Sequence, residues 1–270
     1  MKSVSPVLRS PLKSHGGKWF HKNFVISQFN ESERFVDLTF GSGIVPFNTP
    51  RHSQELFGDL NADIVNFFTV VRDEPEELQQ RLYKVKFNED TFLKAKARLE
   101  GDAEDPIGRA VAHMIVNRMC RSAKGDAFGW SERQRGGRPE NLNSWKSAIN
   151  YIPSTSIRLR KVEIVCGNAI DLAPSLDSAE TKFYFDPPYL HETRTDKKAY
   201  GEFEMTDDDH RRLLAMIVTL KGSVYISGYD SAMYNETLVG FEKVEKKVVN
   251  HSSQDRKKSS RTEIIWFKRA

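Results

Sequence analysis

Residues 182–189, KFYFDPPY, carry the clearest structural signal in this sequence. The apolar segment 183–185 has the composition of a buried strand, and it runs directly into Asp186-Pro187-Pro188-Tyr189. Two successive prolines fix their own backbone angles and disfavour helix in the residue before each, so the chain leaves the strand as a rigid arm. Open α/β sheets bind ligands at the carboxyl ends of their strands. The pattern therefore predicts an α/β sheet with a ligand-binding arm.

The residues of this arm have the groups that methylation of an aromatic amine requires. Such an amine is a poor nucleophile, because its lone pair is delocalised into the ring. Hydrogen bonds from its two N–H groups to the Asp186 carboxylate and the Pro187 carbonyl would favour a pyramidal nitrogen whose lone pair points at a sulfonium methyl group. Tyr189 offers a planar face on which a base can stack. We expect Asp186, Pro187, Pro188 and Tyr189 to be catalytic; a simple strand-ending turn is the alternative interpretation.

A second stretch, FVDLTFGSGIVPFN at residues 35–48, has the form of a strand and turn that bind a cofactor. Alternation over 35–40 predicts a strand that contains Asp37, and the glycines at 41 and 43 let the following turn approach a ligand closely. Asp59, at the end of a second predicted strand over 55–60, has the spacing of a carboxylate that binds ribose hydroxyls. Pro46 replaces the third glycine of a dinucleotide motif, and no G-x-x-x-x-G-K-[ST] loop is present. The pattern favours a nucleoside-like cofactor, although the glycines alone also fit an ordinary turn.

Strand and helix patterns alternate along the chain, with a helical block between them. Strands are predicted at 162–167, 222–229 and 262–268, and an amphipathic helix at 206–220 has Thr206 or Asp207 as its N-cap. A helix is expected to open near Asn61. From about residue 74 to 149 the pattern is helical over 76–85, 91–100 and 109–120, followed by a stretch rich in Gly, Arg and Asn. We therefore expect an α/β domain over 1–70 and 155–270 with an inserted, mainly helical domain over 71–154.

Composition limits the classes to which the chain can belong. The 270 residues include 17 Phe and 4 Trp, enough for a sizeable core, and no apolar run approaches the length of a membrane span. The two cysteines lie far apart without metal-binding spacing, so we expect a cytoplasmic protein with reduced thiols, no membrane segment and no metal. The net charge is +4, yet residues 109–161 hold eleven Lys and Arg against three acids. This bias favours a phosphate-rich partner, with a solvated surface as the alternative.

In combination, these motifs resemble the N6-adenine-specific DNA methyltransferases of the alpha group, the DNA adenine methylase or D12 class. In that family G-G-K precedes F-x-G-S/A-G, a target-recognition insert and D-P-P-Y. This sequence has Gly16-Gly17-Lys18, Phe40-Gly41-Ser42-Gly43, the basic insert and Asp186-Pro187-Pro188-Tyr189 in that order. Similar stretches at 58–61, 135–145, 204–210, 226–234 and 261–267 extend the resemblance over nearly the whole chain.

The resemblance implies a Rossmann-like methyltransferase sheet that uses S-adenosyl-L-methionine, with an inserted target-recognition domain. It implies methylation of adenine N6 in a specific short sequence of duplex DNA, by a cytoplasmic enzyme encoded by a bacterium or a phage. Two alternatives stay open from the residues alone. One is a methyltransferase that uses the same arm on cytosine N4 or on a base in RNA, and the other is a DNA-binding module that has lost its cofactor.

The resemblance also implies which residues bind the cofactor. Lys18 would lie beside its methionine part and near the target strand, Asp37 and the turn over 40–43 would line the methionine pocket, and Asp59 would bind the ribose. Asn168 stands where the family often has Asp, and its carbonyl can still accept a bond from the adenine amine of the cofactor. A second departure is Ser14, where the family usually has Trp. The full set is Gly17, Lys18, Asp37, Phe40, Gly41, Ser42, Gly43, Asp59, Asn168 and Asp186.

A third set of residues is expected to contact DNA. Adenine N6 is paired and stacked within a duplex, so the enzyme must flip the base out. Basic side chains hold the phosphates, while Arg can pair with guanine and Asn with adenine in the major groove. The candidates are Lys18, Arg118 and Arg121 for the backbone and Arg133, Arg135, Arg138, Asn141 and Asn143 for the bases.

Overall fold

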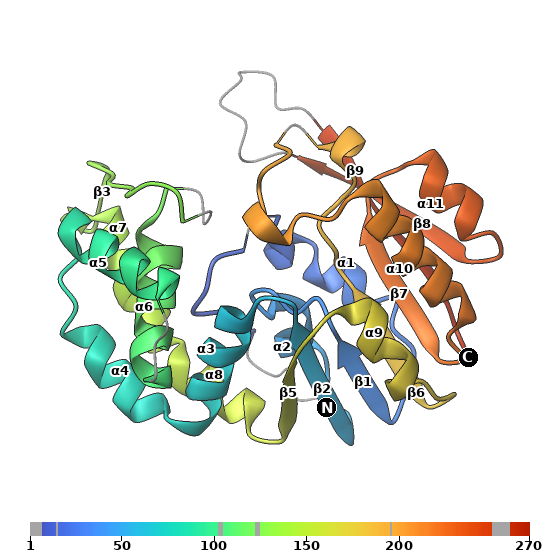
Figure 1. The fold of residues 1–270 in the computed structure, drawn as a ribbon, viewed down its shortest axis with the longest axis horizontal. Coiled ribbons are helices and arrows are strands. Elements are labelled where there is room, and N and C mark those ends of the chain that lie inside the picture. The colour runs from blue at the N-terminus through green and yellow to red at the C-terminus, as the bar shows by residue number, and fades with distance from the viewer. Residues whose placement is uncertain (1–6, 15, 102–104, 122–124, 195, 250–259) are drawn as a thin grey trace. The chain divides into compact units, whose positions relative to one another are not determined.

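A seven-stranded sheet with the order β5-β2-β1-β6-β7-β9-β8 is the main feature of the computed structural model (Figure 1). The structure describes residues 7–14, 16–101, 105–121, 125–194, 196–249 and 260–270. The strands of the sheet are β1 (Arg34–Asp37), β2 (Gln54–Asp59), β5 (Val162–Cys166), β6 (Thr181–Phe185), β7 (Ser223–Gly228), β8 (Glu242–Val249) and β9 (Ser260–Lys268). A separate hairpin consists of β3 (Gln134–Arg135) and β4 (Arg138–Pro139).

The central strands of the sheet are parallel. β1 pairs in parallel with both β2 and β6, so that Val36 lies opposite Leu56 on one side and Phe183 on the other. β6 also pairs in parallel with β7, whereas β9 is antiparallel to β7 and to β8. Every residue of β6 and β7 is buried, as expected for strands that are covered on both faces. Parallel strands alternating with helices confirm the predicted Rossmann-like α/β sheet.

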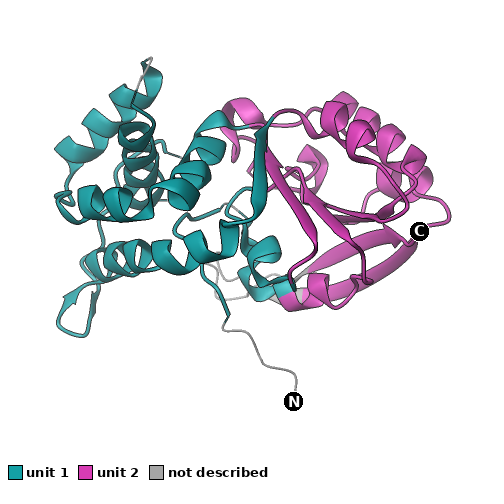
Figure 2. Ribbon diagram, turned by 90° about the horizontal axis from the view of Figure 1, so that it is seen from below, with its two compact units in different colours: residues 1–22, 41–50, 61–166 teal, residues 23–40, 51–60, 167–270 magenta. Residues whose placement is uncertain are grey.

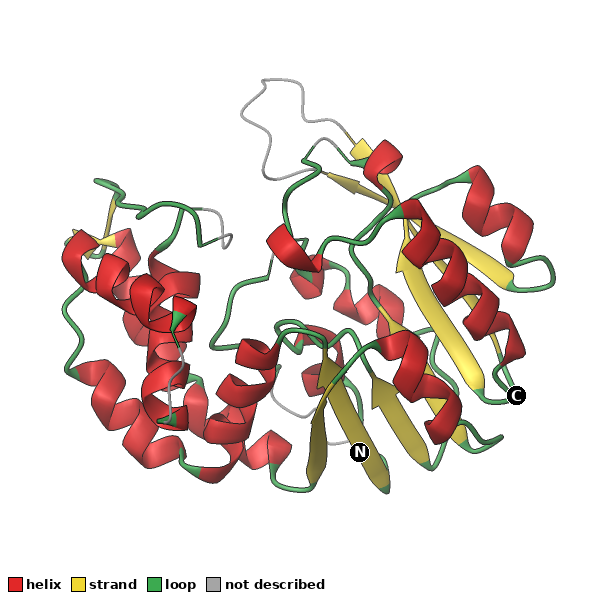
Figure 3. Ribbon diagram, in the orientation of Figure 1, coloured by secondary structure: helices red, strands yellow, loops and turns green. Residues whose placement is uncertain are grey.

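Helices alternate with these strands along the chain (Figure 3). The α-helices are α1 (Lys22–Ile26), α2 (Ile44–Asn48), α3 (Ala62–Asp73), α4 (Pro75–Tyr83), α5 (Glu89–Glu100), α6 (Pro106–Met119), α7 (Glu140–Asn150), α8 (Ile152–Leu159), α9 (Ala169–Leu172), α10 (Asp207–Thr219) and α11 (Ala232–Thr237). Short 3₁₀ turns are η1 (Lys18–Phe20), η2 (Ala173–Leu176), η3 (His191–Thr193) and η4 (Gly201–Phe203). The predicted opening of α3 is confirmed, because the side chain of Asn61 caps its first turn.

The chain divides into two compact units, each of which is formed by several segments (Figure 2). The first comprises residues 1–22, 41–50 and 61–166, and the second comprises residues 23–40, 51–60 and 167–270. In the first unit, aromatic rings fill the space between the helices: Phe87 lies 5.9 Å from Phe128 and 6.1 Å from Trp145, centroid to centroid. The second unit contains β1, β2, β6, β7, β8 and β9.

Three local features differ from the sequence prediction or sharpen it. The strand expected over 35–40 already ends at Asp37, because the Asp37 Oδ1 atom accepts the Thr39 backbone N–H at 3.0 Å and turns the chain. The stretch rich in Gly, Arg and Asn contains α7, whose buried Trp145, Ala148 and Ile149 follow helical spacing. Thr206 is the N-cap of α10 and forms a capping box with Asp209.

Candidate active site

Carboxyl groups from neighbouring strands gather at one edge of the sheet in the second unit. β1 ends at Asp37, β2 ends at Asp59, and Asp186 directly follows the last residue of β6. Because these strands are adjacent and parallel, their carboxyl ends meet at the same edge. This is where open α/β sheets bind ligands. The structure thus brings together Asp37, Asp59 and Asp186, which the sequence had placed in two separate motifs.

A threonine hydroxyl joins the ends of β1 and β6. The Asp186 backbone N–H donates to Thr39 Oγ1 at 2.6 Å, and Thr39 Oγ1 lies 3.3 Å from Asp37 Oδ1. The arm is therefore tied to the loop after β1. Sequence reasoning missed Thr39; the available signal was a hydroxyl residue directly between Asp37 and the glycine turn. The tie keeps the arm next to the predicted cofactor turn at its Phe40 end.

Burial has the largest effect on the Asp37 carboxyl group. Burial raises the pKa of Asp37 well above its ordinary value, and the nearby carboxyls of Asp186 and Asp59 raise it further, while hydrogen bonds from Thr39 oppose the shift. Only 1% of Asp37 is exposed, whereas Asp59 and Asp186 are half-buried. An edge crowded with carboxyl groups favours a ligand with positive charge.

The arm itself is only partly open. Pro187 is buried and Pro188 is half-buried. Only 8% of Tyr189 is exposed, its hydroxyl donates to Glu263 Oε1, and its ring packs edge-on against Tyr229. Burial, followed by the Glu263 carboxylate, raises the pKa of Tyr189 well above its ordinary value. Little of Tyr189, which the sequence predicts to offer a planar face to a base, is therefore accessible.

A surface groove opens beside the arm. Its volume is about 410 Å³, and its lining includes the ring of Tyr229, the partner of Tyr189. The other lining residues are Glu192, Thr193, Asp230 and Thr262. Sequence reasoning did not predict Tyr229 or Glu263 at this site, because only the fold brings them to the arm.

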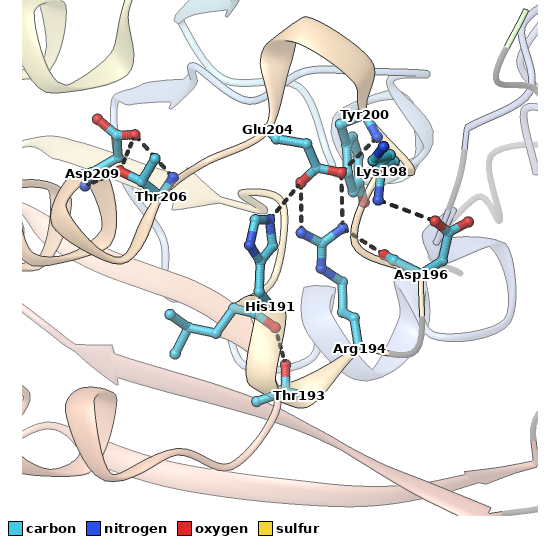
Figure 4. Close-up of polar contacts among 10 residues, drawn as sticks. His191, Thr193, Arg194, Asp196, Lys198, Tyr200, Glu204, Thr206 and Asp209 are labelled. Carbon is cyan, nitrogen blue, oxygen red and sulfur yellow. Dashed lines mark hydrogen bonds and ion pairs between the residues drawn. The ribbon is translucent and has the colours of Figure 1, made fainter.

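Arg194 and Glu204 form an ion pair in the segment that follows the arm. Figure 4 shows the Glu204 carboxylate between Arg194 and His191, with Arg194 Nη2 at 2.6 Å and His191 Nε2 at 3.4 Å. The backbone N–H of Tyr200 also donates to Glu204 at 2.9 Å. Burial alone would raise the pKa of Glu204, but hydrogen bonds from Arg194 and from the Tyr200 backbone outweigh it and lower this pKa. His191, Arg194 and Tyr200 are therefore all joined to Glu204 after the arm.

The predicted cofactor residues of the second unit lie on two neighbouring connections. The Phe40 ring is buried and stacks on Phe57 with 5.1 Å between centroids, and the Gly167 backbone N–H donates to the Asp59 carbonyl at 3.1 Å. Asn168 therefore lies close to Asp59. Its Oδ1 accepts the Ile170 backbone N–H at 2.9 Å and caps α9. A carbonyl oxygen has two lone pairs, so this cap leaves a second acceptor direction on Asn168.

The remaining predicted cofactor residues belong to the first unit. Gly41 and Gly43 have φ values of 51° and 72°, left-handed conformations that a residue with a side chain rarely adopts. Gly43 is the N-cap of α2, and Ser42 between them is buried. Lys18 is buried at the start of η1, and Gly17 precedes it on the surface. The turn conformation predicted from the glycines is confirmed.

The predicted base-reading residues surround the β3–β4 hairpin. Gly136 and Gly137 both have positive φ, 62° and 74°, so they form a tight turn. Among the described residues, no atom lies within 4 Å of where a Cβ would stand on either glycine. Arg133, Arg135 and Arg138 are all exposed, with 79% of the Arg133 side chain accessible.

The other residues predicted to contact DNA are more constrained. The amide nitrogen of Asn143 donates to the Arg135 carbonyl at 2.6 Å, and that of Asn141 donates to the Gly129 carbonyl at 3.1 Å. Arg118 is half-buried, and its Nη2 donates to the Ser144 carbonyl at 3.0 Å, which joins α6 to α7. Burial lowers the pKa of Arg118 to about 10. Arg121, in contrast, is exposed.

The described residues show no further site of two other kinds. None of their helices is both long and apolar enough to cross a bilayer. Among the same residues, no three or more His, Cys, Asp or Glu side chains form a group that could hold a metal ion.

The chain is similar to several known proteins. The D12 class N6 adenine-specific DNA methyltransferase family matches residues 14–252. The DNA adenine methylase of Salmonella typhi is 25% identical over 84% of this chain and 83% of its own length. The DNA adenine methylase of Haemophilus influenzae is 23% identical over 95% of this chain and 92% of its own length. The DNA N-6-adenine-methyltransferase of Escherichia phage P1 is 22% identical over 80% of this chain, which spans only 29% of the phage protein. Among solved structures, an rRNA methyltransferase from Streptomyces viridochromogenes aligns over 99% and 93% of the two chains with 13% identity and a TM-score of 0.39.

Proposed function

The chain belongs to the D12 class N6 adenine-specific DNA methyltransferases, and on that premise we propose how its own residues carry out the reaction. The enzyme methylates adenine in DNA. Its substrate in this proposal is a specific short sequence of duplex DNA, from which the target adenine is flipped into the site at a cost of a few kcal/mol. The observation that carries the proposal is the hydrogen-bonded tie between Asp186 and the loop after β1.

The arm residues act on the amine of the target base. The Asp186 carboxylate and the Pro187 carbonyl accept hydrogen bonds from the two N6–H groups, which directs the nitrogen lone pair away from the ring. The prolines keep both acceptors in place before the base arrives, so little reorganisation is needed during the reaction. When S-adenosyl-L-methionine is bound, it would supply the methyl group to this nitrogen while its sulfur keeps the electron pair of the broken carbon–sulfur bond. Asp186 or water would take the proton that the nitrogen loses. Pro188 and Tyr189 form the wall against which the base rests.

The residues at the strand ends fit S-adenosyl-L-methionine in chemistry. When bound, this cofactor supplies an electrophilic methyl group on a positively charged sulfur. A sulfonium suits an edge at which the carboxyl groups of Asp37, Asp59 and Asp186 come together. Asp59 would accept hydrogen bonds from the ribose hydroxyls, and Asn168 would accept one from the adenine amine. The remaining cofactor contacts are assigned to Gly17, Lys18, Asp37, Phe40, Gly41, Ser42, Gly43 and Asp186.

DNA binding is assigned to the first unit, within an inserted recognition domain over 71–154. Support comes from the exposed arginines around the β3–β4 hairpin, at whose glycine turn no described atom lies within 4 Å of where a Cβ would stand. Arg133, Arg135 and Arg138 would contact bases or phosphates, Arg121 the phosphates, and Lys18 the target strand. Asn141, Asn143 and Arg118 must give up or share their present hydrogen bonds to do so. We further propose that the enzyme acts in the cytoplasm of a bacterium, since its relatives come from bacteria and a phage.

One experiment separates this proposal from the alternatives. The protein is incubated with tritiated S-adenosyl-L-methionine and unmethylated duplex DNA, and the digested nucleosides are separated by chromatography. The expected product is labelled N6-methyladenine nucleoside. Label in N4-methylcytosine, or label only when RNA is the substrate, would overturn the proposed target, and absence of cofactor binding in equilibrium dialysis would indicate a non-catalytic DNA-binding module.

A further inference from the structure

Glu263 is a buried carboxylate at the same edge of the sheet as Asp186. β9 is antiparallel to β7, so Ile264, the residue after Glu263, lies opposite Gly228 at the carboxyl end of β7. β7 is in turn parallel to β6, the strand that leads into the arm. Only 3% of Glu263 is exposed. A carboxylate buried beside an active site needs a hydrogen-bonded partner to offset its desolvation.

That partner is the last residue of the arm. The Tyr189 hydroxyl donates to Glu263 Oε1, across 74 positions in the sequence. The Tyr229 ring packs against the Tyr189 ring with centroids 4.7 Å apart and planes at 81°. A tyrosine side chain has two χ angles, so the prolines at the backbone end and a fixed hydroxyl at the other end together set the plane of its ring.

We infer that Glu263 is a positioning residue for the target base, which holds the Tyr189 ring in the orientation that the flipped adenine contacts while its amine meets Asp186. The inference rests on the proposed function and adds to it the group that orients the wall of the base site. Burial raises the pKa of Tyr189, so its hydroxyl stays a donor at the pH of any ordinary assay. The groove whose lining includes Tyr229 and Thr262 lies beside the pair.

Four variants test this role. Glu263→Met keeps a side chain of similar length but removes the carboxylate acceptor, whereas Glu263→Gln keeps an oxygen that can accept a hydrogen bond from the Tyr189 hydroxyl. Tyr189→Phe removes the hydroxyl donor. The double variant combines Glu263→Met with Tyr189→Phe. The control is Glu55→Gln, since Glu55 is a buried glutamate near the opposite end of β2 in the same sheet. For each protein we would measure kcat and KM on unmethylated plasmid DNA, KM for S-adenosyl-L-methionine, and Tm.

We expect Glu263→Met and Tyr189→Phe each to lower kcat about tenfold, the rate equivalent of one lost hydrogen bond, with KM for the cofactor unchanged. Glu263→Gln should restore most of the rate, Glu55→Gln should match the wild type, and the double variant should be no slower than either single one. Wild-type kcat in Glu263→Met, or multiplicative losses in the double variant, would refute the positioning role. If Glu263→Met does not fold, Tyr189→Phe decides, because a wild-type kcat there refutes the inference. Failure of the wild type to methylate adenine would instead refute the proposed function.

Discussion

Replacing Thr39 by Val removes the hydroxyl that ties the arm to the loop after β1 while it keeps the branched shape of the side chain. In the wild type, Thr39 Oγ1 accepts the Asp186 backbone N–H at 2.6 Å and lies 3.3 Å from Asp37 Oδ1. The change removes both contacts. A net hydrogen bond contributes about 0.5–1.5 kcal/mol, and an unpaired N–H costs about 1–3 kcal/mol when fully buried. Asp186 is half-buried, so water can partly replace the hydroxyl, and a loss of about 1.5 kcal/mol is the reasonable expectation.

If the hydrogen bond from the Asp186 backbone N–H to Thr39 orients Asp186 in the transition state, its loss raises the activation free energy by the same amount and lowers kcat. Thr39→Val should then lower kcat about tenfold, measured as tritiated methyl groups transferred to duplex DNA. Thr39→Ser, which keeps the hydroxyl, is the matched control and should stay within about threefold of the wild type. The reasoning is refuted if Thr39→Val retains the wild-type kcat, or if Thr39→Ser loses as much activity as Thr39→Val.

Three further outcomes follow from other parts of the structure. Burial raises the pKa of Asp37, so the stability that its protonated form contributes is present below the pKa of the unfolded state and is lost as pH rises through the pKa of the folded state. Without cofactor, Asp37→Asn should therefore have a higher Tm than the wild type at neutral pH, and this difference in Tm should close towards pH 4. Burial lowers the pKa of His210 from 6.5 to about 4, so wild-type stability should fall by on the order of 3 kcal/mol as pH drops from 6.5 to 4, a loss that thermal unfolding should not show for His210→Gln. Arg135→Ala and Arg138→Ala should each weaken DNA binding and reduce the slope of log affinity against log salt by about 1 per lost phosphate contact, without changing cofactor binding; unchanged affinity and slope in both would exclude the hairpin from the interface.

The sheet and the position of the arm were predictable because their signals are local. An apolar strand that runs into two prolines, and a strand that runs into glycines, constrain the backbone whatever surrounds them. The cap of α10 was predictable for the same reason, since Thr206 and Asp209 satisfy N–H groups within one turn.

The rest of the site depends on contacts between distant segments. Nothing near Glu263 in the sequence indicates Tyr189, because β9 reaches the arm only through its antiparallel pairing with β7. The burial of Arg118 was equally hidden, since an arginine in a basic segment looks like a surface charge until α7 covers it. The sequence also predicted that Tyr189 offers a planar face for a base, whereas tertiary packing leaves only 8% of the residue exposed.

The most direct test of the account compares Asp186→Ala with the wild type in two assays on the same preparations. One assay measures the rate of methyl transfer to adenine in duplex DNA, and the other measures the Kd of S-adenosyl-L-methionine by equilibrium dialysis. We expect the rate to fall by about a hundredfold or more, the effect of losing one preorganised acceptor, while the Kd changes far less. Methyl transfer at the wild-type rate, or a loss of cofactor binding as large as the loss of rate, would contradict the assignment of Asp186 to the target amine.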